Sequence, residues 1–165
     1  MKYIKYLIYI LRHKWFVFIE CFKMKIIWRG IFHDLSKFRP SEFIPYANHF
    51  YGEKASDINK GRDSSGYYEA GNTGDLNFDI AWFYHQKRNR HHWQWWIIPI
   101  NCNCYKILSM DEDSIKEIVC DWVGAGKAIN GKDSSVNSWY NQNKDKITLN
   151  TETRRKIEEI LKLYK

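Results

Sequence analysis

Residues 33–37 read HDLSK, a run that sets a histidine beside an aspartate and a lysine shortly after them. Histidine also occurs upstream, at His13, and aspartate recurs far downstream, at Asp121. Imidazole nitrogens and carboxylate oxygens are the usual ligands for Zn, Mn, Fe and Ni, and adjacent donors on one helix can reach one cation. The run therefore predicts a metal site that includes His33 and Asp34.

The order of a histidine, a His-Asp pair and a final aspartate resembles the HD superfamily of metal-dependent phosphohydrolases, over roughly residues 10 to 125. HDLSK looks like the HD-hydrophobic-Gly-Lys variant of that motif, with Ser36 in the glycine position. The resemblance implies a metal held by donors from the first, second and fifth helices, namely His13, His33, Asp34 and Asp121. It also implies that Lys37 contacts phosphate or a bridging water.

A narrower resemblance covers almost the whole chain. The blocks RHKWFVFIECFKMKIIWRGIFHDLSKFRPSEFIPYA, AWFYHQKRNRHHWQWW and DWVGAGKAI together resemble a phage and bacterial family known as domain of unknown function 5662. This resemblance implies one compact unit and supplies no activity. In the last block, Gly124 and Gly126 are expected to permit close helix packing, because the block is not a phosphate-binding loop of the Walker type.

A second histidine cluster comprises His85, His91 and His92. On a helix predicted over 76–96, His85 and His92 share a face with Arg88 nearby, and His91 is turned about 100° away. By resemblance to HD hydrolases with additional histidines, His85 and either His91 or His92 bind a second metal or the substrate phosphate. The alternative is a solvated basic face, against which the tryptophans at 93, 95 and 96 argue.

Other polar residues are weaker candidates. Glu42 is a further ligand, a general base or, as we favour, only a carboxylate at a helix start. Arg88 and Arg90 can form bidentate contacts with phosphate, and Lys127 is a similar candidate. His49 is left out of the ligand set.

The composition favours one folded domain with phosphate-bearing partners. At 165 residues with 44% hydrophobic and 17% aromatic content, the chain can build one sizeable core and is not disordered. The formal charge of +7 and the pI of about 9.2 suit a nucleotide, a nucleic acid or an anionic membrane, although the excess is equally consistent with solvated lysines.

The cysteines and the N-terminus bear on location. The four cysteines fit no zinc-finger spacing and no secretory signal is visible, which favours a reduced cytoplasmic setting.

The apolar runs YLIYIL and WFVFIECF are separated by Arg12, His13 and Lys14, so neither approaches the roughly 20 residues of a membrane span. We favour a buried helix, with an interfacial amphipathic helix as the alternative. Trp15 is expected in the core, where its truncation would cost about 3 to 5 kcal/mol.

The periodicity predicts an all-α, compact single-domain bundle of about five to seven helices resembling the HD-domain fold. Helices are expected over 2–21, 25–35 with His33 and Asp34, 41–50 with Ser41 as a candidate N-cap, 76–96 ended by Pro99, about 112–129, 135–144 and from 151 onward. Apolar residues of the first helix recur at Ile4, Leu7, Ile8, Leu11, Trp15, Phe18 and Ile19. Residues 51–76 are expected to be a flexible loop or lid, and 100–108 an irregular or extended segment.

Two functional classes follow. The first is an HD-type phosphohydrolase that uses one or two divalent ions (Zn, Mn, Fe, Ni or Co) to cleave a phosphomonoester or phosphodiester of a nucleotide-like substrate, with cyclic nucleotides and nucleic acid included. Its catalytic residues would be Asp34, Lys37, His85 and Arg88. The second is a non-catalytic binding or inhibitory module, phage-encoded, that sequesters a nucleotide or protein partner. The sequence does not indicate an oligomeric state.

Overall fold

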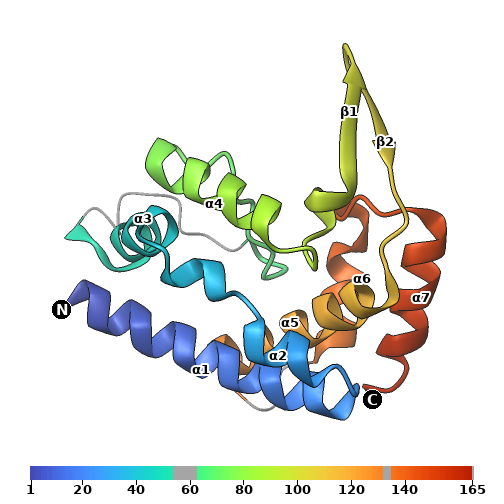
Figure 1. Cartoon of the computed structure of the whole chain (residues 1–165), viewed down its shortest axis with the longest axis horizontal. Helices are drawn as coiled ribbons and strands as arrows, with labels where there is room; N and C mark the ends of the chain where they lie inside the picture. Colours follow the sequence, from blue (N-terminus) through green and yellow to red (C-terminus); the bar gives the residue numbers. More distant parts are fainter. Residues whose placement is uncertain (54–62, 132–134, 165) are drawn as a thin grey trace.

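The computed structural model describes residues 1–53, 63–131 and 135–164, and it confirms an all-α, single-domain architecture (Figure 1). The α-helices are α1 (Lys2–Lys23), α2 (Ile27–Phe32), α3 (Pro40–Tyr51), α4 (Leu76–Arg88), α5 (Glu112–Asn130), α6 (Val136–Asn143) and α7 (Thr151–Leu161). Short 3-10 turns are η1 (Leu35–Phe38), η3 (Trp93–Trp96) and η4 (Lys144–Lys146). Strands β1 (Ile97–Asn101) and β2 (Cys104–Ile107) form an antiparallel hairpin.

The seam between α1 and α5 places the first and last predicted metal ligands opposite each other. Gly124 on α5 lies so close to α1 that an added Cβ would come within 2.5 Å of Val17 Cγ2 and 2.9 Å of the Val17 backbone nitrogen. The expected close packing at Gly124 is therefore confirmed. Since His13 lies on α1 and Asp121 on α5, this approach brings their side chains within reach of each other.

Gly124→Ala is expected to lower the free energy of unfolding by about 1 to 3 kcal/mol, because overpacking forces the two helices apart. Urea titration followed by circular dichroism measures the loss. Val17→Ala in the same chain removes the nearer clashing atom and should restore part of the lost free energy of unfolding. The effects of the two substitutions on stability should therefore not be additive. Additive losses would contradict the proposed contact.

Two apolar clusters flank this seam. One joins α5, α6 and α7 around Ile115, Ile118, Tyr140 and Ile157. The other joins α1, α3 and α4, with buried residues Tyr6, Ile10, Tyr46, Ala47, Phe78 and Ala81. His13, His85 and Asp121 lie on α1, α4 and α5, so the packing of both clusters fixes the helices that carry them.

Two predicted helices end earlier than expected. The helix expected over 25–35 stops at Phe32, and His33 and Asp34 occupy a tight turn before η1. The helix expected over 76–96 stops at Arg88, well before Pro99, and η3 and the hairpin follow. The seven-residue argument that placed His85 and His92 on one helical face is therefore wrong, because both His91 and His92 lie beyond the helix.

The other helix starts agree with the sequence within a residue or two. Asp111, Ser135 and Asn150 cap α5, α6 and α7 through side-chain hydrogen bonds from backbone N–H groups. The expected Ser41 cap is wrong: α3 begins at Pro40, a residue whose fixed φ suits the first turn, and Arg39 precedes it.

The buried face of α1 is not the face that its apolar periodicity suggested. The buried residues are Tyr6, Ile10, His13, Val17, Glu20 and Cys21. Trp15, expected in the core, is 61% exposed, so its truncation opens no core cavity and the expected loss of 3 to 5 kcal/mol is wrong. Both faces of α1 carry large apolar residues, and only packing against α5 and α3 distinguishes them.

The loop predicted over 51–76 is anchored where the structure describes it. Helix α3 extends to Tyr51, and residues 54–62 lie outside the described residues. From residue 63 onward, Asp63 pairs with Lys146 at 2.5 Å, and Ser65 Oγ donates to Asn143 Oδ1 at 2.6 Å. These contacts tie residues 63–67 to α6 and η4. Across the described residues, none of the helices is long and apolar enough to cross a membrane.

Candidate metal centre

The His33-Asp34 turn has a backbone conformation that directs two side chains inward. His33 is extended, with φ −50° and ψ 127°, and Asp34 is left-handed, with φ 54° and ψ 25°. Aspartate tolerates this region better than most residues with a Cβ, yet the conformation still costs of order 1 kcal/mol and tends to occur at functional sites. Both side chains are buried. The surrounding helices thus hold a strained turn in place.

The first donor group contains the four residues of the predicted metal set. His13 Nε2 lies 3.4 Å from His33 Nε2 and 3.1 Å from Asp121 Oδ1. Asp34 Oδ2 is 3.4 Å from His33 Nε2 and 3.8 Å from His13 Nε2, and His33 Nε2 is 3.5 Å from Asp121 Oδ1. Donors bound at 2.0–2.2 Å to one ion stand about 3.0 to 3.6 Å apart, and all these distances except the 3.8 Å one fall in that range. His13, His33 and Asp34 form a group that could hold an ion, and Asp121 borders this group through its contacts with the two histidines.

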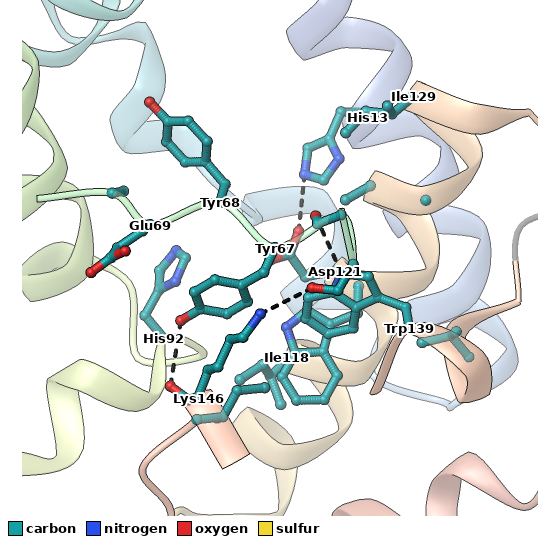
Figure 2. A pocket seen from close by; sticks show the side chains of 18 of the residues that line it. His13, Tyr67, Tyr68, Glu69, His92, Ile118, Asp121, Ile129, Trp139 and Lys146 are labelled. Carbon is teal, nitrogen blue, oxygen red and sulfur yellow. Dashed lines mark hydrogen bonds and ion pairs between the residues drawn. The ribbon is translucent and has the colours of Figure 1, made fainter. Parts of the chain in front are cut away.

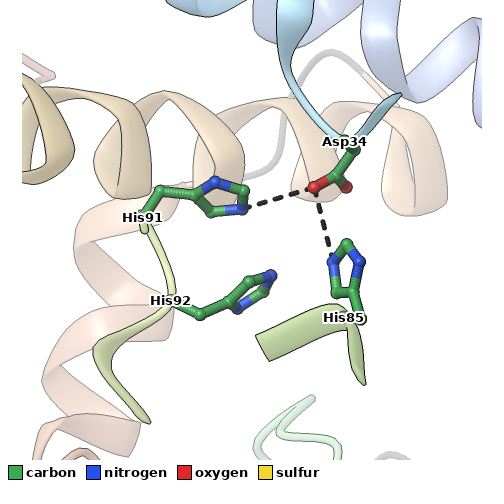
Figure 3. Close-up of side chains that lie close together, drawn as sticks. All are labelled: Asp34, His85, His91 and His92. Carbon is green, nitrogen blue, oxygen red and sulfur yellow. Dashed lines mark ion pairs between the residues drawn. The ribbon is translucent and has the colours of Figure 1, made fainter. Parts of the chain in front are cut away.

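The second donor group forms around the other oxygen of Asp34 (Figure 3). Asp34 Oδ1 lies 3.4 Å from both His85 Nε2 and His91 Nε2, and His92 offers a further nitrogen within 4.8 Å of these atoms. Among the described residues, the Nε2 atoms of His85, His91 and His92 have no hydrogen-bond partner. Buried nitrogens left unsatisfied at one point are the pattern expected of ligands that await a cation.

Asp34 and Asp121 connect the two groups. Asp34 turns Oδ2 toward His13 and His33 and Oδ1 toward His85 and His91. Asp121 does likewise, with Oδ2 at 3.8 Å from His91 Nε2. The arrangement could hold two ions that share carboxylates. A set of imidazoles and carboxylates without thiolates suits Zn, Mn, Fe, Co or Ni better than Ca or Mg.

Glu117 supports the two groups from behind. Its Oε1 lies 3.0 Å from His33 Nδ1 and 3.2 Å from His91 Nδ1. These are hydrogen-bond lengths, so although the same three residues could hold an ion themselves, we interpret Glu117 as the acceptor for both Nδ1–H groups. That contact leaves each Nε2 lone pair directed at the donor groups, as in carboxylate–histidine–metal triads.

Glu42 supports His85 in the same way. Its Oε2 lies 3.0 Å from His85 Nδ1 and accepts a hydrogen bond from Ser36 Oγ at 2.8 Å. Arg88 donates to Glu42 Oε1 at 2.5 Å, and Asn89 donates to the His85 carbonyl at 2.8 Å. Glu42 is therefore more than the helix-start carboxylate that we favoured, and Ser36 of HDLSK is part of its support.

The charge distribution at the centre favours a cation. Burial lowers the pKa of His13, His85 and His92, which keeps these ligands neutral. Burial also opposes protonation of His33, but the charge of Asp34 and hydrogen bonds to Asp121 and Glu117 outweigh it and raise its pKa to about 10. The excess negative charge that holds a proton on His33 is charge that a metal ion would balance.

Glu117→Gln is expected to weaken metal binding by about 10- to 100-fold, because the amide orients two imidazoles less well than the carboxylate. The pKa of Glu117 is held at about 2 by His33 and His91 against the effect of burial, so the native group is ionised. Competition with a chromophoric chelator measures the affinity. Glu112→Gln, on the exposed start of the same helix, is the matched control and should leave it unchanged. Equal affinities in both variants would contradict the supporting role.

A cavity of about 1020 Å³ opens beside the centre (Figure 2). His13, His92, Asp121 and Lys37 form part of its wall. The rest of the wall is mixed, and its aromatic members include Tyr6, Tyr9, Tyr46, Tyr67, Tyr68, Trp82, Trp93, Trp122 and Trp139. The donor groups are thus buried from bulk water but border a space large enough for a small organic molecule.

Lys37 and Arg88 are the predicted cationic residues of the active site, and they lie on different sides of the donor groups. Lys37 Nζ lies 2.6 Å from Asp34 Oδ2 and borders the cavity. Arg88 instead contacts Glu42 behind His85, and it borders a smaller space of about 470 Å³ on another side of His91. The geometry thus gives Arg88 a positioning role.

The weaker candidates Arg90 and Lys127, and also His49, have partners outside the donor groups. Arg90 pairs with Asp111 at 3.0 Å, and Lys127 pairs with the buried Glu20 at 2.7 Å. His49, left out of the ligand set, is bonded to Asp75 and Tyr68. Glu117 was missed by the sequence interpretation; its one signal was its position, a single helical turn before Asp121.

Comparison with known proteins gives a family and no activity. No curated protein and no solved structure matches the chain. The model of the Family of unknown function (DUF5662) matches residues 2–163, which include every residue of both donor groups and both supporting glutamates. The chain belongs to this family.

Proposed function

We propose that the protein is an HD-like, metal-dependent phosphohydrolase that acts on a nucleotide-like phosphate ester. One observation carries the proposal: the two oxygens of the buried Asp34 carboxylate face two sets of histidine Nε2 atoms at 3.4 to 3.8 Å, at the wall of a large cavity. Two-metal sites with shared carboxylates are typical of enzymes that cleave phosphate esters.

The cavity beside the centre supports the substrate class. Its aromatic walls can stack on a planar base, and Lys37 and Lys146 supply positive charge at separate points of the same space. Rings such as Tyr67 and Trp139 already stack on one another at 6.5 Å between centroids. A ligand with an aromatic part and a phosphate part would match both kinds of surface.

The chain's own residues have distinct tasks in this proposal. His13, His33, Asp34 and Asp121 would hold one ion, and His85, His91 and His92 would hold a second that shares Asp34. A bound divalent ion polarises phosphoryl oxygens and lowers the pKa of a water molecule. Lys37 neutralises phosphate charge at the cavity wall, and the aromatic walls exclude bulk water, which strengthens each of these electrostatic contacts.

Metal analysis combined with a hydrolysis screen tests the proposal. The purified chain is stripped with a chelator, reloaded with Mn, Fe, Co, Ni or Zn, and assayed by mass spectrometry for bound metal. Phosphate release is then measured from nitrophenyl phosphate, bis-nitrophenyl phosphate, nucleoside mono- and triphosphates and cyclic nucleotides. We expect two ions per chain and turnover that chelation abolishes and metal restores.

Two outcomes would contradict the proposal. Absence of bound metal in every reloading would exclude the centre itself. Two bound ions without hydrolysis of any ester, together with tight binding of a nucleotide, would instead identify a binding module on the same scaffold. Asp145→Ala, which removes an exposed carboxylate that belongs to neither donor group, is the control for nonspecific loss of metal.

A further inference from the structure

One face of α1 carries a row of exposed apolar side chains, which we call the α1 stripe. It consists of Ile4, Ile8, Leu11, Trp15 and Phe22, each between 53% and 64% exposed. At about 100° per residue these five positions fall within a narrow sector of the helix, and the row runs for about 27 Å along it. No described element packs on this face, and α1 lies along one edge of the molecule (Figure 1).

Basic residues border the α1 stripe. Lys5, Arg12 and Lys23 follow one of its edges, at positions that helical geometry places beside it. Residues 1–39 contain nine lysines and arginines, and their only two acidic residues, Glu20 and Asp34, are buried. The rest of the chain has seventeen basic and seventeen acidic residues, so the whole formal charge of +7 belongs to this segment.

We propose that the α1 stripe docks on an anionic lipid membrane surface, with α1 lying in the plane of the interface. Apolar and Trp side chains would enter the boundary between headgroups and acyl chains, and the basic border would face anionic headgroups. A second copy of this chain is a poorer occupant, because stacking two stripes would oppose basic borders with no exposed acid in either segment to pair with them. The docking concerns a face other than the metal centre and does not depend on the proposed hydrolysis.

Vesicle co-sedimentation with the full chain tests the proposal. Phosphatidylcholine vesicles with and without phosphatidylglycerol are the probes. We expect binding to anionic vesicles at least about tenfold tighter than to neutral ones, and weaker binding as salt rises. Ile8→Glu with Trp15→Glu should abolish binding. Lys5→Glu with Arg12→Glu should weaken it by about fivefold for each positive charge removed.

Matched controls separate docking from unfolding and from self-association. Ile100→Glu changes an apolar residue of similar exposure on the β1–β2 hairpin and should bind vesicles as the native chain does. Circular dichroism and metal content verify that each variant is folded. Equal binding to neutral and anionic vesicles, or none to either, would overturn the proposal. So would a dimer in sedimentation analysis that only the Ile8→Glu and Trp15→Glu pair dissociates.

Discussion

Asp34→Ala is expected to remove both metal ions and to lower turnover of a phosphate ester by about 10³-fold or more, roughly 4 kcal/mol in transition-state stabilisation. Each donor group loses an oxygen, because Asp34 Oδ2 serves His13 and His33 and Oδ1 serves His85 and His91. Helical content should change little, since the substitution removes hardly any apolar area from the core. Metal content by mass spectrometry and turnover under saturating metal measure the two losses.

The left-handed backbone at residue 34 provides a matched control. Asp34→Gly removes the same carboxylate but accepts φ 54° without strain, so it should be more stable than Asp34→Ala by about 1 kcal/mol. Both variants should lack metal equally. If Asp34→Gly retained both ions, the loss in Asp34→Ala would come from backbone distortion and the bridging role of the carboxylate would be wrong.

His85→Ala is expected to remove one ion and keep the other, and to lower turnover by about a hundredfold, on the order of 3 kcal/mol. The reason is that His85 belongs to the second donor group and His13 to the first. His85 contacts Asp34 Oδ1 and Glu42, so its loss affects the second group. Metal titration should therefore fall from two equivalents to one. His13→Ala should produce the complementary loss from the other group.

His49→Ala is the control for this pair, because it removes an equally buried imidazole outside the donor groups. It should reduce stability, through the lost contacts to Asp75 and Tyr68, and leave two ions bound. Loss of both ions in His85→Ala would show that the two donor groups act as one site. Unchanged turnover in His85→Ala would leave the second group without a catalytic task.

The residues that the sequence placed best are those whose spacing is set by long helices. His13 and Asp121 lie well inside α1 and α5, and their approach needs only that the two helices pack, as Gly124 allows. The starts of α5 to α7 were also predicted within a residue, because a helix start depends on local interactions between neighbours in sequence. The fold class and most helix starts could thus be predicted.

The second donor group could not be derived in the same way. Its geometry depends on where α4 ends, and no Pro or Gly marks that end at Arg88. Once the chain leaves the helix, His91 rather than His92 comes to 3.4 Å from Asp34 Oδ1, the opposite of what helical periodicity implied. The contact of Glu42 with His85 joins residues more than forty positions apart, which no local pattern reveals.

The orientation of α1 was lost for a different reason. Its sequence is apolar on two faces, and the row with the more regular spacing is the one that stays exposed. Hydrophobic periodicity measures how apolar a face is and not what covers it. The histidine between the two apolar runs was the better indicator, because His13 lies on the buried face.

The seam at Gly124 also determines when in folding the donor groups can exist. His13 and Asp121 are separated by about 100 residues, so bringing them together costs chain entropy. Other contacts offset that cost only when most of the chain has collapsed. During synthesis α1 leaves the ribosome long before α5, so the nascent chain cannot present both residues to a cation. Metal binding would therefore follow docking of the first helix on the fifth. A cation would bind and stabilise completely synthesised, folded chains and not nascent ones.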